Sequence, residues 1–435
     1  MAKFKRKEDE HTSEGLPLVG IDSGSSSFKL LAAEPTDPQH PYGSQLRIVA
    51  ADQSTRYRCV KKGIIQNTSE ASYMIRESLL LLSNRLHIDN LPTAFTLLGG
   101  KTMRCIDVTV KRVMGYRGPI KMQLIDEMQK ECLTKVDKAP SAQPIASLDA
   151  RGAEFLIDDE ETVHNLEAGH VLTRVQGVYS TFFGSPDLRE KVTGSFERAG
   201  KSIEQSFARP SALLEALASE QDELIGVAII DMGSDTTTIS VYKGGHFLTT
   251  KVAALGGNNI TMDVQQLGIS AQNAEKLKLR FGSAFMEEEA PKTVRIPNAR
   301  EGEEPILVKT DFLSTIIVSR LEEIMQPIFA ELKKFEDQIG QVYITGGASK
   351  MANMVEYVQS HTTLPVAYGS HADWLDEQTE PQFYGPEYSA VVGSLLLGAK
   401  FRQEHPGKAL PGTKVPSGGK GIMKTLTDLF TQENN

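Results

Sequence analysis

The chain has 435 residues, of which 40% are hydrophobic and 24% charged, and it carries a formal net charge of −9. A chain of this length is too long to fold around a single hydrophobic core, so we expect two or more domains. The acidic balance argues against nucleic acid as a partner, since a general nucleic-acid binder has an excess of basic residues. Cys59, Cys105 and Cys132 lie far apart without metal-ligand spacing, which is typical of a reducing compartment. There is no run of about 18 apolar residues, so we expect no membrane-spanning helix.

We expect the charged residues 1–14 to be disordered and an α/β domain to begin at residue 15. That domain opens with an apolar strand ending at Asp22, a turn that contains Gly24, Ser25 and Ser26, and a second strand that carries Lys29. Glycine lets the backbone approach an anion, and successive amides with Ser hydroxyls can hold phosphate oxygens. A plain hairpin turn is the alternative interpretation of this pattern taken alone.

The next segments alternate between helix and strand, which indicates an α/β layer architecture. Residues 69–86 have the apolar spacing of a helix, and residues 94–100 form an apolar strand that ends in two glycines. Residues 101–177 differ, with a helix over 124–135 and short strands over 152–158 and 171–178. We therefore predict an inserted α+β subdomain there.

A second copy of the hairpin pattern occupies residues 226–242. Its first strand ends at Asp231, and its turn contains Gly233, Ser234, Thr236 and Thr237. Two copies in one chain favour a phosphate clamp over two unrelated hairpins. Because carboxylates repel phosphate, we expect Asp22 and Asp231 to act through a bridging Mg²⁺ and its water molecules.

A third element follows in residues 341–354, where an apolar strand runs into Gly346, Gly347 and Ala348 and then into a helix. Paired glycines let a base and a ribose lie against the backbone, although a plain packing turn is the alternative. The later helix over 387–400 is rich in small residues, and Gly393 and Gly398 permit close packing.

The order of these elements resembles that of the actin/Hsp70/sugar-kinase ATPase superfamily. The resemblance implies an actin-like two-domain α/β fold, with ATP and Mg²⁺ held in a cleft between the two halves. It assigns nucleotide contacts to the residues named above in the two hairpins and in the Gly-Gly turn. Residues 274–278 resemble the helix whose Glu and Lys reach the ribose and base, here Glu275 and Lys278; a solvated helix face is the alternative.

Within the superfamily the chain is similar to the bacterial cell-division family FtsA. The similarity lies in Lys62–Asn67, Thr250–Asp263 and Tyr388–Gly393, and it is poor in 101–177. It implies the subdomain division of that family: subdomain 1A in 15–100 and 178–220, subdomain 1C in 101–177, subdomain 2A in 221–255 and 311–380, subdomain 2B in 256–310, and a late helix of 1A in 381–401.

The end of the chain predicts a membrane-targeting segment. Residues 402–420 are rich in Gly, Pro and Lys and are expected to form a flexible linker. In residues 421–435 one apolar stripe follows helical spacing, formed by Ile422, Met423, Leu426, Leu429 and Phe430. Such a helix can lie on an anionic bilayer, and docking on this or another protein is the alternative.

The FtsA resemblance implies an ATP-binding scaffold that polymerises on the cytoplasmic face of the inner membrane at the division site. It further implies binding of the tail of FtsZ and recruitment of later division proteins. Candidate contacts for the acidic FtsZ tail are Arg295, Arg300 and Arg320, each with a solvated charge as the alternative. Residues 178–185 supply no evident hydrolytic base, so we expect at most slow ATP hydrolysis. The alternative functions are a PilM-like adaptor of pilus assembly and a kinase or ATPase enzyme of the same superfamily.

Overall fold

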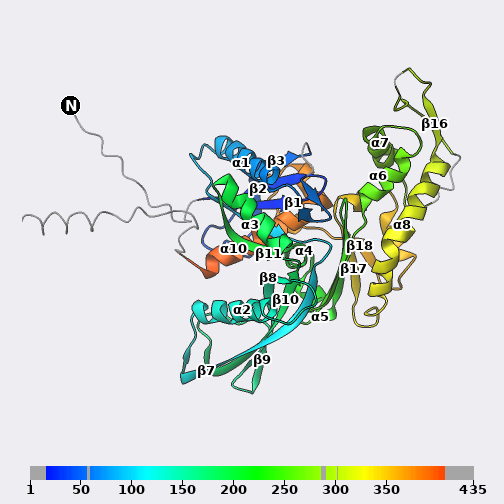
Figure 1. Ribbon diagram of the computed structural model, residues 1–435. Helices are drawn as coiled ribbons and strands as arrows, with labels where there is room; N and C mark the ends of the chain where they lie inside the picture. Colours follow the sequence, from blue (N-terminus) through cyan, green and yellow to red (C-terminus); the bar gives the residue numbers. More distant parts are fainter. Residues whose placement is uncertain (1–15, 56–58, 286–290, 301, 407–435) are drawn as a thin grey trace, which may run out of the picture.

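The computed structural model describes residues 16–55, 59–285, 291–300 and 302–406 (Figure 1). The first half is built on a five-stranded sheet in the order β11-β6-β1-β2-β3. Its central hairpin is antiparallel, whereas β6 and β11 run parallel to β1, so the carboxyl ends of these three strands meet at one edge. The strands are β1 (Leu18–Ser23), β2 (Phe28–Pro35), β3 (Leu46–Ser54), β6 (Thr93–Leu98) and β11 (Ser202–Ala208).

The second half repeats this arrangement in another five-stranded sheet, in the order β14-β13-β12-β17-β18. An antiparallel hairpin again lies beside a strand that runs parallel to its first member. The strands are β12 (Val227–Met232), β13 (Thr237–Lys243), β14 (His246–Ala253), β17 (Gln341–Thr345) and β18 (Val366–Tyr368). The two sheets therefore present equivalent hairpin turns.

Helices flank each sheet. The helices of the first half are α1 (Thr68–Arg85), α3 (Asp187–Ala199), α4 (Arg209–Leu217) and α10 (Ser389–Glu404). Those of the second half are α5 (Glu220–Ile225), α6 (Gly257–Gln265), α7 (Ala271–Phe281), α8 (Thr310–Leu332) and α9 (Met354–Gln359). Asn67 caps α1, because its side chain accepts the N–H groups of Ser69 and Glu70 at 3.1 Å each. Two further short hairpins are β4 (Val60–Lys61) with β5 (Ile64–Ile65) and β15 (Thr293–Ile296) with β16 (Ile306–Lys309).

The inserted segment forms a four-stranded antiparallel sheet in the order β7-β10-β8-β9, with one helix packed against it. Its elements are β7 (Arg104–Pro119), α2 (Met122–Asp137), β8 (Ala146–Ile157), β9 (Glu161–Val163) and β10 (Val171–Gly184). The prediction of an α+β unit is confirmed, but the prediction of short strands is wrong. The sequence analysis missed β7, whose side chains are mostly exposed or half-buried and show no continuous apolar face.

Each part has its own hydrophobic core. One cluster is centred on the first half, with Ile21 and Phe95, and extends to Val227 and Ile229 of β12. Another cluster in the second half includes Ile230 and Ile344. A third cluster lies between α2 and its sheet. Two similarly built sheets, each packed against its own hydrophobic cluster, confirm the predicted two-domain α/β architecture.

Some sequence expectations concern residues that the structure does not describe. The expected disordered start, the linker beyond residue 406 and the terminal apolar stripe lie outside the described residues. That stripe consists of Ile422, Met423, Leu426, Leu429 and Phe430. Helix α10 ends at Glu404, beyond the expected end of the late helix at residue 401. In the described part of the chain, no helix has the length and apolar character needed to span a bilayer.

Candidate functional site

The two hairpin turns have the same local geometry. The N–H of Gly24 donates to Ser27 O at 3.1 Å, and the N–H of Gly233 donates to Thr236 O at 2.8 Å. A Cβ at either glycine would lie within 3 Å of that same carbonyl oxygen, so each turn requires glycine. The repeated sequence pattern is therefore a repeated structure. In both copies a buried Asp, Asp22 or Asp231, lies just before the turn.

The hydroxyl groups of the two turns have different surroundings. Ser25, Ser234 and Thr236 are half-buried, and Ser26 is exposed. Thr237 is buried, and its hydroxyl donates to Leu255 O at 3.1 Å, so its role in the structure is to anchor the turn. The other four hydroxyl-bearing residues are at least partly accessible to solvent.

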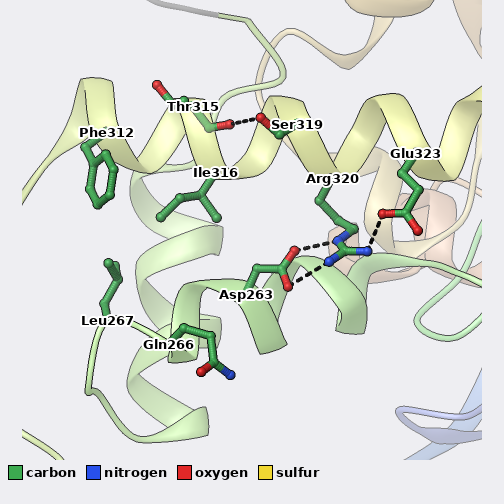
Figure 2. Close-up of a pocket in the computed structure, with 9 residues that line it drawn as sticks. All are labelled: Asp263, Gln266, Leu267, Phe312, Thr315, Ile316, Ser319, Arg320 and Glu323. Atoms are coloured by element: carbon green, nitrogen blue, oxygen red, sulfur yellow. Dashed lines mark hydrogen bonds and ion pairs between the residues drawn. The ribbon is translucent and has the colours of Figure 1, made fainter.

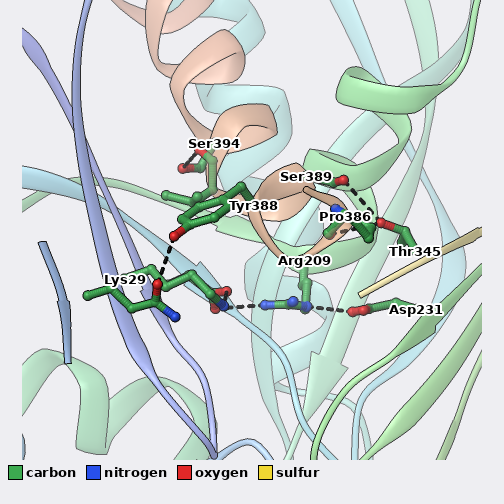
Figure 3. A network of polar contacts seen from close by, with 11 residues as sticks. Lys29, Arg209, Asp231, Thr345, Pro386, Tyr388, Ser389 and Ser394 are labelled. Carbon is green, nitrogen blue, oxygen red and sulfur yellow. Dashed lines mark hydrogen bonds and ion pairs between the residues drawn. The ribbon is translucent and has the colours of Figure 1, made fainter. Parts of the chain in front are cut away.

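An arginine that the sequence analysis missed lies between the two carboxylates (Figure 3). Arg209 Nη1 donates to Asp22 Oδ1 at 2.7 Å, and Arg209 Nε donates to Asp231 Oδ2 at 2.6 Å. Arg209 is the first residue of α4 and directly follows the buried strand β11. Because β1 and β11 end at the same sheet edge, its side chain starts beside Asp22. A charged residue at the end of a parallel strand was the signal that could have revealed it.

The positive charge of Arg209 lowers the pKa of the neighbouring Asp22. Burial acts to raise the pKa of Asp22, but the positive charges of Arg209 and Lys29 lower it below the usual range. Lys29 Nζ lies 3.6 Å from Asp22 Oδ2. Burial acts to lower the pKa of Arg209, and the two carboxylates raise it instead. Among the described residues, Asp22 Oδ2 and Asp231 Oδ1 have no hydrogen-bond partner.

The expected Mg²⁺ does not fit between these side chains as they lie. The guanidinium group already bridges Asp22 and Asp231, and it neutralises charge that a metal ion would need. Within the described ranges, no group of three or more His, Cys, Asp or Glu side chains is placed to hold a metal. The sequence pattern predicts a bridging Mg²⁺ because it does not reveal Arg209, whose guanidinium group bridges the two carboxylates in the structure.

The Gly-Gly turn after β17 lies against the second hairpin. Gly346 has a φ of 89°, and a Cβ there would lie 2.4 Å from Asp231 Oδ1. Thr345 Oγ1 bonds to Pro386 O at 3.1 Å and to Ser389 Oγ at 3.0 Å, which ties the turn to the start of α10 (Figure 3). Glycine is required at position 346 for both reasons, its positive φ and its contact with Asp231.

The predicted Glu275 and Lys278 converge on the same region. Lys278 is buried, and its Nζ donates to Gly257 O at 3.1 Å and forms an ion pair with Glu275 at 2.8 Å. A Cβ added at Gly257 would lie 3.1 Å from Ala348 Cβ and 3.6 Å from Lys278 Nζ. The alternative of a solvated helix face is therefore wrong for Lys278.

The two halves also touch beside the turns. The N–H of Lys62 donates to Asp235 Oδ2 at 3.2 Å, which joins the first half to the second hairpin turn. Lys62 has a φ of 53°, in the left-handed region. Together with Arg209, this bond connects the halves on the side where the hairpins face each other.

The three arginines expected to bind an acidic tail do not come together. Arg320 lines a cavity of about 570 Å³ between α6 and α8 (Figure 2). Its guanidinium donates to both oxygens of Asp263, at 2.5 and 2.9 Å, and to Glu323 at 2.5 Å. Arg300 is exposed and pairs with Glu303 at 3.2 Å, and Arg295 lies on β15. Neither of these two is among the residues that line the cavity.

The repeated hairpin sheets and the facing turns define the class of actin-like ATPase folds. The solved PilM–PilN type IV pilus biogenesis complex is similar with a TM-score of 0.62 and 15% identity, over 88% of this chain and 99% of that chain. The structure of MreB5 of Spiroplasma citri bound to ADP is similar with a TM-score of 0.53 and 10% identity, over 90% of this chain and 98% of that chain. These likenesses confirm the predicted actin-like fold and concern the fold alone.

The sequence comparisons narrow the similarity to one family. The family model described as Cell division protein FtsA matches residues 228–393. The chain is 27% identical to Cell division protein FtsA of Bacillus subtilis (strain 168) over 88% of this chain and 83% of the relative. It is 25% identical to that of Neisseria meningitidis serogroup B over 93% of this chain and 96% of the relative. The predicted resemblance to FtsA is confirmed: this chain is an actin-like relative of that cell-division family.

Proposed function

We propose that this chain is a nucleotide-binding scaffold of bacterial cell division that assembles at the inner membrane. The observation that carries the proposal is the pair of matching turns, each preceded by a buried Asp, in a chain similar to FtsA over most of its length. In this proposal ATP lies between the turns, and closure of the two halves around it favours a polymer. The FtsA relatives favour division over pilus assembly, although PilM shares the fold.

We assign the parts of the nucleotide to groups on the two sides of the cleft. The backbone amides and hydroxyls at Gly24–Ser26 and Gly233–Thr236 would receive the phosphates, with Lys29 as a cation nearby. Gly346, Gly347 and Ala348 would face the adenosine, and Glu275 and Lys278 its ribose and base. Slow hydrolysis at most is proposed, because the segment 178–185 contains no Gln, Glu or Asp that could position the attacking water.

The cavity between α6 and α8 is the proposed site for the FtsZ tail. Leu267, Phe312 and Ile316 offer apolar contacts, and Arg320 offers a guanidinium now held by Asp263 and Glu323. A carboxylate of the tail would replace one of these two partners. Arg295 and Arg300 stay candidates for outer contacts. Lipids, further copies of this chain and later division proteins complete the proposed partners.

Two lysines of α7 provide a matched test of the nucleotide site. Lys278→Gln removes a buried ammonium beside Ala348, whereas Lys276→Gln changes an exposed lysine two residues earlier on the same helix. We expect Lys278→Gln to weaken binding of a fluorescent ATP analogue about tenfold, or about 1.4 kcal/mol. Lys276→Gln should bind as the wild type does. Equal binding by all three proteins would reject the role of Lys278, and no binding by the wild type would reject the function.

A further inference from the structure

Arg209 is fixed in place by the elements around it. The preceding residue, Ala208, donates its N–H to the buried Asp149 Oδ2 at 2.8 Å. Gly99 allows the approach of the arginine side chain, because a Cβ there would lie 3.2 Å from Arg209 Cβ. The backbone at the start of α4 is therefore held by Asp149, and the Arg209 side chain packs against Gly99. These contacts fix the direction in which the guanidinium group extends toward the two carboxylates.

The charges of this group balance without a metal ion. Asp22 and Asp231 have side chains that are only 3% and 7% exposed, and an unneutralised pair of buried carboxylates would be strongly destabilising. Arg209 donates one hydrogen bond to each of them, and Lys29 lies near the second oxygen of Asp22. Two carboxylates thus face two cations. In the absence of nucleotide, a divalent cation added here would create an excess of positive charge.

We propose that Arg209 is the resident cation of this site, so that closure of the two halves does not require a divalent metal. The guanidinium joins Asp22 of the first half to Asp231 of the second and performs the bridging that the sequence had suggested for Mg²⁺. One consequence rests on the proposed nucleotide function. If Arg209 supplies the bridging charge, ATP binds with equal affinity in the presence and absence of Mg²⁺. Removal of the guanidinium opens a cation site between the two carboxylates.

The first experiment measures melting temperatures without nucleotide, in millimolar MgCl₂ and in EDTA at matched ionic strength. We expect no shift for the wild type and a rise of about 3 °C with Mg²⁺ for Arg209→Ala, since the metal replaces the missing charge. Arg402→Ala is the matched control, because it removes an arginine from the buried Glu204 at the other end of β1, beside Leu16 and Pro17, and should show no Mg²⁺ shift. If Arg209→Ala does not fold, Arg209→Lys replaces it and should show an intermediate shift.

The second experiment measures binding of the fluorescent ATP analogue to the wild type in Mg²⁺ and in EDTA. We expect the two affinities to agree within about twofold. Loss of binding in EDTA, or an equal Mg²⁺ shift in melting temperature for wild type and Arg209→Ala, would overturn the inference and leave the proposed function intact. No binding in either buffer would reject the nucleotide function, and the melting comparison would still decide the role of Arg209.

Discussion

The buried Asp149 side chain holds the backbone next to Arg209 in place. Its two oxygens accept the N–H groups of Ala150 at 2.9 Å and Ala208 at 2.8 Å, so it holds the residue before Arg209. Burial raises the pKa of Asp149 to about 6, while these backbone N–H groups act in the opposite direction. The native protein therefore keeps a proton there in a pH range where the unfolded chain, with a pKa of 3.8, has released it.

This raised pKa predicts a pH dependence of stability. Between about pH 4 and about pH 6 this carboxyl group binds more protons in the native state than in the unfolded state. Its contribution to the free energy of unfolding therefore falls as pH rises, by up to about 1.4 kcal/mol per unit. Asp149→Asn cannot titrate, and we expect its fall over this range to be smaller. Urea unfolding midpoints across the range measure the effect. An identical pH slope in both proteins would show that Asp149 does not titrate there.

Among single residues, the sequence predicted Asp22 and Asp231 as members of the site but did not predict Arg209. The two acids belong to a repeated local pattern, which can be recognised without knowing the fold. Arg209 contacts carboxylates that lie 187 and 22 residues away, so its role depends on tertiary structure. The same is true of Lys278, whose buried position distinguishes it from an ordinary helix-surface lysine only in the folded chain.

A single glycine, Gly393, allows helix α10 to pack closely against helix α4. A Cβ at Gly393 would lie 1.8 Å from Ala212 O, closer than any contact allows. The start of α10 also binds the turn after β17, through Ser389 and Thr345. The small-residue helix predicted from the sequence is therefore confirmed as a close-packed helix, and it positions one wall of the candidate site.

We predict that Gly393→Ala separates these two helices. Overpacking of this kind should lower the free energy of unfolding by about 2 kcal/mol or more and weaken ATP-analogue binding through the displaced turn. Gly194→Ala is the matched control in α3, where nothing lies within 4 Å of an added Cβ, and should be neutral or stabilising by about 0.5–1 kcal/mol. Urea midpoints and analogue binding measure both. Equal stability of the two variants would contradict the packing argument.

Across the whole molecule, the inserted sheet is attached to both halves. Arg151 of β8 pairs with the buried Glu215 of α4 at 3.1 Å and lies 3.8 Å from Glu223 of α5. Asp107 of β7 contacts His246 of β14 at 2.7 Å. The sequence predicted that an insertion exists, because its composition and periodicity change at residue 101. It could not predict these attachments, since each joins side chains that are distant along the chain.

The proposed membrane scaffold is tested on the full chain with anionic vesicles. Leu426→Glu places a charge on the apolar stripe of the terminal segment, whereas Thr427→Glu places the same charge beside it. We expect Leu426→Glu to stay in the supernatant when phosphatidylglycerol vesicles are sedimented, because a charge within the apolar stripe opposes its burial in the bilayer. Thr427→Glu should sediment with the vesicles, and both should bind the ATP analogue. Sedimentation of Leu426→Glu at the wild-type level would reject the membrane contact.

The buried bridge at Arg209 has a consequence for the ionic conditions under which the molecule works. Mobile ions screen charges that face solvent over roughly 8–10 Å at ordinary salt, and they weaken exposed pairs such as Arg300 with Glu303. They have little access to Asp22 and Asp231, whose carboxylates are almost fully covered. Salt therefore weakens the ion pairs of Arg209 with Asp22 and Asp231 less than it weakens exposed surface pairs.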